Sequence, residues 1–249
     1  MQRSLKSRGM SHSEPTRGEA PLHLRPTAAL AERVLLPGDP GRALALAQAL
    51  LVDPLMFNHH RGLWGYTGAG PDGEPLTIQA TGMGGPSAAI VFSELILLGA
   101  RRAIRVGTCG ALSGELALGD LVIARESICA DGASRALSGA ERVAADPSLT
   151  EALMRCAPGA HAGTIVSVDL FYERPGERPG KRRVHEALAV EMEAAALFAL
   201  GAGADVPVAC VLAVSDTFLQ SGARRRIDDD SLRTAGERMG AVAAAAISA

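Results

Sequence analysis

The spacing of apolar and polar positions along the chain predicts strands and helices that alternate. Short unbroken apolar runs, typical of strands covered on both faces, are followed by helical patterns that open at Gly, Asp or Pro. This alternation predicts an α/β fold: a single domain with a mixed, largely parallel central sheet flanked by helices. The expected strands are 33–36, 64–68, 76–80, 103–107, 121–124, 162–168, a segment near Val190 and 206–214; the expected helices are 41–51, 87–98, 147–156, 194–200 and a last one from about Ser231.

The start of the chain differs from the rest. Residues 1–20 are polar and lack periodicity, so we expect a flexible tail there. Residues 21–249 carry the alternating pattern without an internal repeat or a low-complexity linker, which predicts one domain over that range.

Composition and charge narrow the functional classes. With 25 Lys and Arg against 27 Asp and Glu, the net charge of −2 argues against a nucleic-acid binder that relies on bulk positive charge. No apolar run is long enough to span a bilayer and the start lacks a signal-peptide core, so we expect a cytoplasmic protein without membrane contact. The four cysteines form no C-x-x-C pair, which predicts reduced thiols and no zinc site.

Unusual residues gather where the expected strands end, and ligands collect at that edge of such folds. The glycine turns at Gly38 and at 82–85 each precede a helix and could present backbone N–H groups to an anion. Turns that only connect elements are the alternative, since neither matches a dinucleotide or P-loop fingerprint.

Arginines add to this anion hypothesis. Arg42 lies one turn into the helix behind Gly38, and Arg105 interrupts an apolar strand, where a charge is costly unless it is paired. The partner of Arg105 is either a bound oxyanion or a structural Asp or Glu. For Arg61, in a His-His-Arg-Gly loop, a solvated side chain is the default.

Acidic side chains follow two of the late strands. Of Glu191 and Glu193, we expect one to face a ligand, where a carboxylate suits a ribose diol, while the other caps or pairs; a solvated pair at a helix start is the alternative. Asp216 ends the most hydrophobic strand, as a catalytic acid or as an N-cap. The run 224–230 has the charges of a solvated face.

Taken in order, seven segments resemble the purine nucleoside phosphorylase and uridine phosphorylase family, in its hexameric bacterial branch and closest to the purine enzymes. The resemblance runs from about His23 to the end of the chain. The segments are L-P-G-D-P-G-R at 36–42, R-G-L-W-G-Y-T-G at 61–68, G-M-G-G-P-S at 82–87, I-R-V-G-T-C-G-A at 104–111, S-V-D-L-F-Y at 167–172, V-E-M-E-A-A at 190–195 and V-S-D at 214–216.

The resemblance implies a pentosyltransferase with the nucleoside phosphorylase fold, which cleaves purine nucleosides with phosphate to free base and (deoxy)ribose 1-phosphate. It implies no metal and no organic cofactor, with inorganic phosphate as co-substrate. It also implies a homohexamer built as a trimer of dimers, with each active site shared across a dimer.

The site residues that the resemblance implies fall into three groups. Arg105 and the general acid Asp216, which protonates purine N7, are the catalytic pair. Phosphate binding is assigned to Gly38, Arg42, Arg105, Thr108 and, from a neighbouring subunit, Arg61. Nucleoside binding is assigned to Phe171, Glu191, Met192, Glu193, Ser215 and, also from the neighbour, His23.

Departures from the family pattern leave alternatives open. Thr108 stands where many relatives have Ser, and the arginine that assists the acid could be Arg224, Arg225 or Arg226. A uridine phosphorylase is the second choice, since 173–178 offers arginines but not the glutamine typical of uridine-specific relatives. Hydrolytic nucleosidases lack the phosphate arginines. A non-catalytic nucleoside-binding module would have no need to keep both those arginines and the acid.

Overall fold

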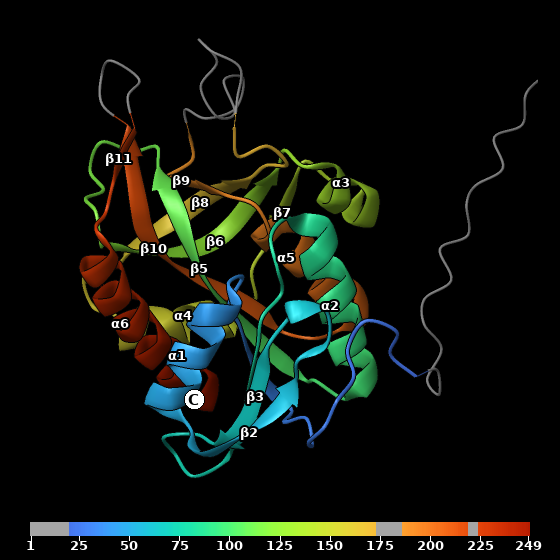
Figure 1. Ribbon diagram of the computed structural model, residues 1–249. Coiled ribbons are helices and arrows are strands. Elements are labelled where there is room, and N and C mark those ends of the chain that lie inside the picture. The colour runs from blue at the N-terminus through green and yellow to red at the C-terminus, as the bar shows by residue number, and fades with distance from the viewer. Residues whose placement is uncertain (1–19, 173–185, 219–223) are drawn as a thin grey trace, which may run out of the picture.

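The computed structural model describes residues 20–172, 186–218 and 224–249 (Figure 1). The predicted tail over 1–20 lies outside these residues except for Ala20. The segment 173–178, on which the comparison with uridine enzymes rests, lies entirely outside them.

All the described strands join one mixed sheet. They are β1 (Arg33–Leu36), β2 (Val52–Asn58), β3 (Gly65–Ala69), β4 (Pro75–Gln79), β5 (Arg102–Ala111), β6 (Leu121–Cys129), β7 (Arg142–Ala144), β8 (His161–Ser167), β9 (Ala189–Glu191), β10 (Val208–Phe218) and β11 (Arg224–Arg226). The helices are α1 (Pro40–Leu50), α2 (Gly85–Leu98), α3 (Gly132–Ser138), α4 (Pro147–Cys156), α5 (Ala194–Ala204) and α6 (Asp229–Ser248), with a short 3-10 helix η1 (His60–Gly62).

The central strands close on themselves. The strand order is β11-β10-β6-β8-β9-β5-β1-β4-β3-β2, and β10 also pairs with β5 in parallel from Val208 to Asp216. Because β10, β6, β8, β9 and β5 are successive neighbours, the extra β10–β5 ladder turns them into a closed ring. The strands β1, β4, β3 and β2 extend from this ring, ending in an antiparallel meander.

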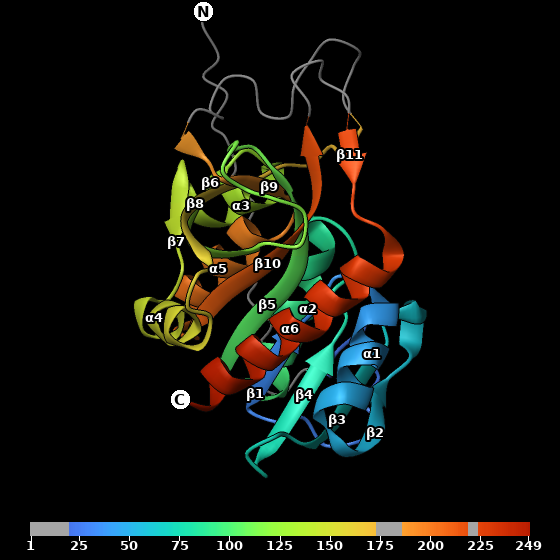
Figure 2. The ribbon, with the colours of Figure 1, turned by 90° about the vertical axis from the view of Figure 1, so that its left-hand side faces the viewer.

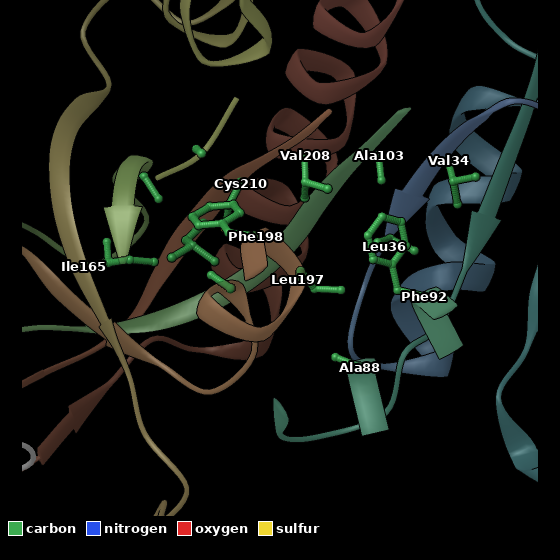
Figure 3. Packing of buried hydrophobic residues seen from close by; sticks show 14 of the residues in the cluster. Val34, Leu36, Ala88, Phe92, Ala103, Ile165, Leu197, Phe198, Val208 and Cys210 are labelled. Atoms are coloured by element: carbon green, nitrogen blue, oxygen red, sulfur yellow. The ribbon is translucent and has the colours of Figure 1, made fainter. Parts of the chain in front are cut away.

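Helices cover both faces of the sheet. Figures 1 and 2 show α1, α4 and α6 on one face, whereas α2, α3 and α5 lie on the other. One core cluster lies under each group of helices. In the cluster on the α2 and α5 face, Phe198 and Leu197 of α5 lie near Val208 and Cys210 of β10 (Figure 3). No described helix is long and apolar enough to cross a membrane.

Helix starts follow from the sequence. The side chains of Asp39, Asp146 and Asp228 cap α1, α4 and α6, each accepting a hydrogen bond from a backbone N–H in the first turn. A proline occupies the first turn of α1, α2 and α4, where its missing N–H costs nothing. These caps explain why the predicted helices begin within a few residues of the observed ones.

The mixed α/β fold predicted from the pattern is confirmed, and four of the strands and α-helices were missed. The order of the strands and helices in the prediction matches the structure, and the expected strands 64–68 and 76–80 form the hairpin of β3 and β4. The missed elements are β2, α3, β7 and β11, and β5 extends four residues beyond the predicted Gly107. The longer β5 carries Thr108 and Cys109 inside the sheet instead of in a loop after it. Within the described residues the four cysteines are free thiols.

Candidate active site

A pocket of about 560 Å³ opens at the carboxyl ends of β1, β5 and β10, where the strand pattern predicts a ligand site. Its volume is in the usual range for small-molecule sites. The lining includes most of the predicted site residues: Gly38, Arg42, Arg105, Thr108, Phe171, Glu191, Met192, Glu193, Ser215 and Asp216. The other residues around it are Asp39, Pro40, Gly82, Met83, Cys109, Gly110, Val168, Leu170, Val190, Phe218, Arg224, Arg226 and Leu232.

One side of the pocket carries two arginines. Gly38, Asp39 and Pro40, at the N-terminus of α1, line it, and Arg42 lies in the first turn of that helix. Burial lowers the pKa of Arg42, with the nearby charge of Arg105 adding to the effect, so two guanidinium groups are close together. An oxyanion placed between them would relieve their repulsion.

Arg105 is almost fully buried between two carboxylates. Its Nε donates to Glu191 Oε2 at 2.9 Å and its Nη2 donates to Glu193 Oε2 at 2.5 Å. Burial alone would lower the pKa of Arg105, but the charges of Glu193 and Glu191 outweigh it and raise the pKa. Of the two partners that the sequence allows for Arg105, the structural carboxylate is therefore present. These ion pairs use only Nε and Nη2 of the guanidinium.

The remaining nitrogen of Arg105 faces the glycine turn. Nη1 is buried without a hydrogen-bond partner among the described residues, and a Cβ on Gly38 would come within 3.9 Å of it. A buried donor left unpaired costs about 1–3 kcal/mol, so an acceptor at this position would stabilise the protein. Arg105 can thus hold its two carboxylates and still donate to an anion beside Gly38.

Glu191 is a positioning residue inside this network. It accepts hydrogen bonds from the Ser167 hydroxyl and from the backbone N–H groups of Glu193 and Ala194, so it caps α5 while it binds Arg105. Burial raises the pKa of Glu191, against the opposing charge of Arg105. Both acids bind the same guanidinium from the short bend that joins the end of β9, at Glu191, to the start of α5 after Glu193.

Glu193 is the carboxylate nearer the ligand space. Its Oε1 accepts a hydrogen bond of 2.5 Å from the backbone N–H of Gly84, at the N-terminus of α2. This contact fixes the side chain in front of the pocket and places its negative charge at the positive end of the helix. Met192, between the two acids, also lines the pocket.

Asp216 lines the pocket farther along the β5–β10 ladder than Arg105. The residue lies inside β10 after a bulge, so it is not the N-cap that the sequence left possible. Ser215 Oγ donates to its Oδ2 at 2.7 Å, whereas its buried Oδ1 has no hydrogen-bond partner among the described residues. Nε of Arg224 and Nη1 of Arg226 lie 3.8 and 3.6 Å from Oδ1.

The register of β11 sorts the three arginines. Arg226 pairs with Asp216, Arg225 with Thr217 and Arg224 with Phe218 across the antiparallel ladder. Arg224 and Arg226 therefore share the pocket face, and Arg225 points the other way. Of the two alternatives that the sequence leaves for 224–226, a solvated charge run does not describe Arg224 and Arg226, because β11 places both in the pocket lining near the acid.

His23 and Arg61 do not line the pocket of their own chain. His23 Nδ1 lies 2.7 Å from Glu94 Oε1, where a protonated Nδ1 donates, and its backbone oxygen lies 2.9 Å from His60 Nδ1. Arg61 is exposed on η1 with a φ of 60°, a left-handed conformation that is unusual for a residue other than glycine. Their delivery to a neighbouring subunit's pocket stays a prediction.

Two residues of the site escaped the sequence reasoning. Phe218 also lines the pocket, and its position two residues after Asp216 on a strand could have revealed it. Glu94 accepts hydrogen bonds from the backbone N–H groups of Leu22, His23 and Leu24 and so anchors the segment that carries His23. Glu94 is the single acidic residue of the apolar helix α2, and this isolated charge was the feature of the sequence that could have indicated a role for it.

We also asked whether the described side chains could bind a metal ion. Among the residues that the structure describes, no group of three or more His, Cys, Asp or Glu side chains could hold a metal ion. The charged groups that line the pocket are arginines and carboxylates: Asp39, Arg42, Arg105, Glu191, Glu193, Asp216, Arg224 and Arg226.

Comparisons with known proteins agree with this geometry. The family model of the phosphorylase superfamily matches residues 32–248. A "Purine nucleoside phosphorylase DeoD-type" of Jannaschia sp. (strain CCS1) is 39% identical over 199 residues, covering 76% of this chain and 84% of the relative. Proteins of the same name from Clostridium beijerinckii and Alkaliphilus metalliredigens are 39% and 35% identical, each over 202 residues; these cover 78% of this chain and 84% and 85% of the two relatives. The chain belongs to the phosphorylase superfamily.

Proposed function

We propose that this protein is a purine nucleoside phosphorylase, a pentosyltransferase that cleaves the glycosidic bond of purine nucleosides with inorganic phosphate. The observation that supports this most is the set of charged groups that line one pocket, with Arg42 and Arg105 as cations and Asp216 farther along the β5–β10 ladder than Arg105. The names of the relatives over most of the chain point to the same reaction.

In this reaction a phosphate oxygen attacks C1′ while the bond from C1′ to the purine nitrogen breaks. The sugar gains positive charge and the leaving base takes the bonding electron pair. Arg42, Arg105 and the N-terminus of α1 hold the phosphate beside C1′, where its own negative charge stabilises the sugar cation. Thr108, in the pocket wall on β5, supplies a hydroxyl for the same anion.

Glu193 receives the ribose hydroxyls. Its carboxylate is anchored by Gly84 and Arg105, so it meets the substrate in a fixed position. Asp216 donates a proton to purine N7 as the base leaves, and Ser215 holds the acid in orientation through Oδ2. The free Oδ1 faces Arg226, which stabilises the carboxylate that forms after proton transfer.

We also propose an oligomeric state and a cellular location for this enzyme, both taken from the family resemblance. His23 and Arg61 complete the pocket of a neighbouring subunit, in a hexamer made of three such dimers. Exposed apolar side chains near these two residues, among them Leu22 and Trp64, give the subunits a surface to bury. The enzyme works in the cytoplasm without a metal or an organic cofactor.

Release of base from inosine, guanosine, adenosine and uridine, each with and without phosphate, tests the proposal. We expect purine release only when phosphate is present, together with formation of ribose 1-phosphate. Equal turnover in phosphate-free buffer would identify a hydrolytic nucleosidase. Release from uridine alone would identify a uridine phosphorylase, and release from none of the four a binding module.

A further inference from the structure

A single buried side chain joins the two segments that carry His23 and Arg61. Asn58, the only asparagine in the chain, ends β2 and is fully buried. It pairs with Gly65 across the β2–β3 ladder, so residues 59–64 form the loop between these two strands. The Asn58 side chain therefore lies at the base of the loop that carries Arg61, in the interior of its own subunit.

The amide of Asn58 bonds to both segments at once. Its Oδ1 accepts a hydrogen bond of 2.9 Å from the backbone N–H of Arg25. Its Nδ2 donates to the Leu63 carbonyl at 2.5 Å and more weakly to the His60 carbonyl at 3.4 Å. An N–H needs an acceptor and a carbonyl needs a donor, so only an amide in this orientation satisfies both sides. An aspartate or a leucine of similar size could not do so.

Two further contacts complete the same unit. The Gln79 side chain also donates to the Leu63 carbonyl, at 3.0 Å. His60 Nδ1 lies 2.9 Å from the His23 carbonyl, which can only accept. The loop is thus tied to β4 on one side and to the segment of His23 on the other. The Glu94 carboxylate on α2 holds that segment in turn.

Arg61 needs this support because its backbone is in a conformation that arginine rarely adopts. Its φ of 60° is in the left-handed region, and its side chain is exposed. Such a conformation persists only where the surrounding structure over-determines it. Around Arg61 that structure is the turn bond from the Leu63 N–H to the His60 carbonyl, at 3.2 Å, together with the amide bonds to the Leu63 carbonyl.

We propose that Asn58 is a positioning residue for phosphate binding in the neighbouring subunit's pocket, because it holds the loop of Arg61 in the conformation that delivers the guanidinium there. The inference rests on the proposed function, in which Arg61 acts in a neighbour's phosphate site, and it adds the residue that places Arg61. Asn58 itself is fully buried in its own subunit and touches neither substrate. Because its amide also binds the segment of His23, the two contributions to the neighbour's pocket are expected to move as one unit.

A double-mutant cycle between Asn58 and Arg61 tests this inference, with inorganic phosphate as the probe and the oligomer kept intact. Calorimetry gives the dissociation constant of phosphate for the parent, Asn58→Ala, Arg61→Ala and the double variant. Arg61→Ala should raise it roughly 10- to 100-fold, as for a lost charge-assisted hydrogen bond, and Asn58→Ala roughly 3- to 10-fold. Since Asn58 acts through Arg61, the double variant should match Arg61→Ala within about twofold.

Thr77→Val is the matched control for the loss of buried hydrogen bonds. Thr77 is fully buried on β4, where its hydroxyl accepts from the Ala31 N–H at 2.9 Å and donates to the Thr67 hydroxyl at 3.0 Å. This variant should keep the dissociation constant of phosphate within about twofold of the parent. If Asn58→Ala does not fold, Asn58→Ser takes its place in the cycle, because one short hydroxyl cannot bridge both segments.

Kinetics with inosine adds a second measurement. Asn58→Ala should raise the KM for phosphate with a much smaller change in kcat, whereas a general loss of structure would lower kcat.

The inference is overturned if the two effects on phosphate binding multiply in the double variant, because Asn58 would then act independently of Arg61. An unchanged phosphate affinity in Asn58→Ala or in Arg61→Ala would also overturn it. So would a monomeric parent, or dissociation of Asn58→Ala into smaller oligomers. If the parent binds phosphate but cleaves no nucleoside, the proposed function fails, and the cycle still decides this inference.

Discussion

Arg105 and Glu193 are joined by a hydrogen bond of 2.5 Å from Nη2 to Oε2, so the proposed phosphate cation and the proposed ribose carboxylate are in direct contact. A change in the position of either side chain must move the other. Phosphate and nucleoside affinity are therefore expected to change together when this contact is disturbed, although the two ligands meet different residues.

Replacing Gly107 tests this coupling without removing a charge. A Cβ at this position would lie 2.7 Å from Arg105 Nη2, so Gly107→Ala forces the guanidinium away from Glu193. Each hydrogen bond lost from a charged pair costs about 1.5–3 kcal/mol. Initial-rate kinetics should show a higher KM for both phosphate and inosine. The control is Gly203→Ala, where no atom lies within 4 Å; a rise in only one KM would contradict the coupling.

Arg42→Gln is expected to weaken phosphate binding selectively. The side chain lies at the N-terminus of α1 and contributes a charge-assisted donor, so the KM for phosphate should rise roughly 10- to 100-fold. The KM for inosine should change much less, since Glu193 and Asp216 stay in place. The exposed Arg101→Gln serves as the control for loss of charge. An unchanged phosphate KM would remove Arg42 from the anion site.

Asp216→Asn distinguishes an acid from a structural residue. A neutral purine needs a proton at N7 as it leaves, whereas a 7-methylated purine already carries the positive charge. Inosine phosphorolysis should fall by about 10²- to 10⁴-fold, as for a lost general acid, with a much smaller change for 7-methylguanosine. The measurement is the ratio of the two rates in variant and parent. If both rates fall alike, Asp216 does not act as the proton donor.

Mixing two inactive variants tests whether sites are shared between subunits. Arg61→Ala removes a residue expected to act in the neighbour's pocket, and Asp216→Ala removes the acid of the chain's own pocket. In a mixed pair, one pocket regains both residues and the other loses both. Inosine phosphorolysis should therefore reappear after verified subunit exchange. Persistent inactivity would place Arg61 outside the catalytic machinery.

Glu94→Gln should lower stability in a pH-dependent way. Burial would raise the pKa of Glu94, but hydrogen bonds from the backbone N–H of Leu24 and the ring of His23 outweigh it and hold the pKa below its ordinary value of 4.5. A carboxyl whose pKa is lower in the folded state stabilises that state above pH 4.5 and loses this contribution as the pH falls. Glu94→Gln should therefore cost about 1–3 kcal/mol near neutral pH.

Denaturant titrations at pH 7 and pH 3.5 measure this difference, with the exposed Glu115→Gln as control. The gap between parent and Glu94→Gln should shrink at the lower pH, because the parent has begun to lose its own carboxylate contacts. A gap of equal size at both pH values would show that the charge of Glu94 is not what anchors the segment.

The sequence predicted those elements whose local signals agree. Helix α4 begins at Pro147 after the Asp146 cap and ends at Cys156, as predicted. The prediction from the sequence missed β2, because Asp53 and Pro54 interrupt the apolar pattern there. Only pairing with β3 makes that segment a strand, and such pairing is not visible in a local window.

In the site, too, local sequence signals indicated single residues but not the contacts that depend on distant strands. That Arg105 has an anionic partner could be predicted, because a charge inside an apolar strand needs one. That Glu191 and Glu193 share its guanidinium could not, because this contact joins segments far apart in the sequence. The roles of Arg224 and Arg226 could not be predicted either. Their position over Asp216 depends on the antiparallel register of β11, and three consecutive arginines carry no local signal for a strand.

The two strands at the ends of the sheet order are both poor templates for another chain. β2 carries Pro54, a break in its register and a left-handed Asp53, and β11 consists of three arginines whose charges would repel an incoming copy of itself. Edge-to-edge aggregation is thereby discouraged at both ends. Arg225, which does not line the pocket, thus adds to solubility. Replacing all three arginines of β11 by neutral residues would remove the charges that protect this strand edge and would also alter the site.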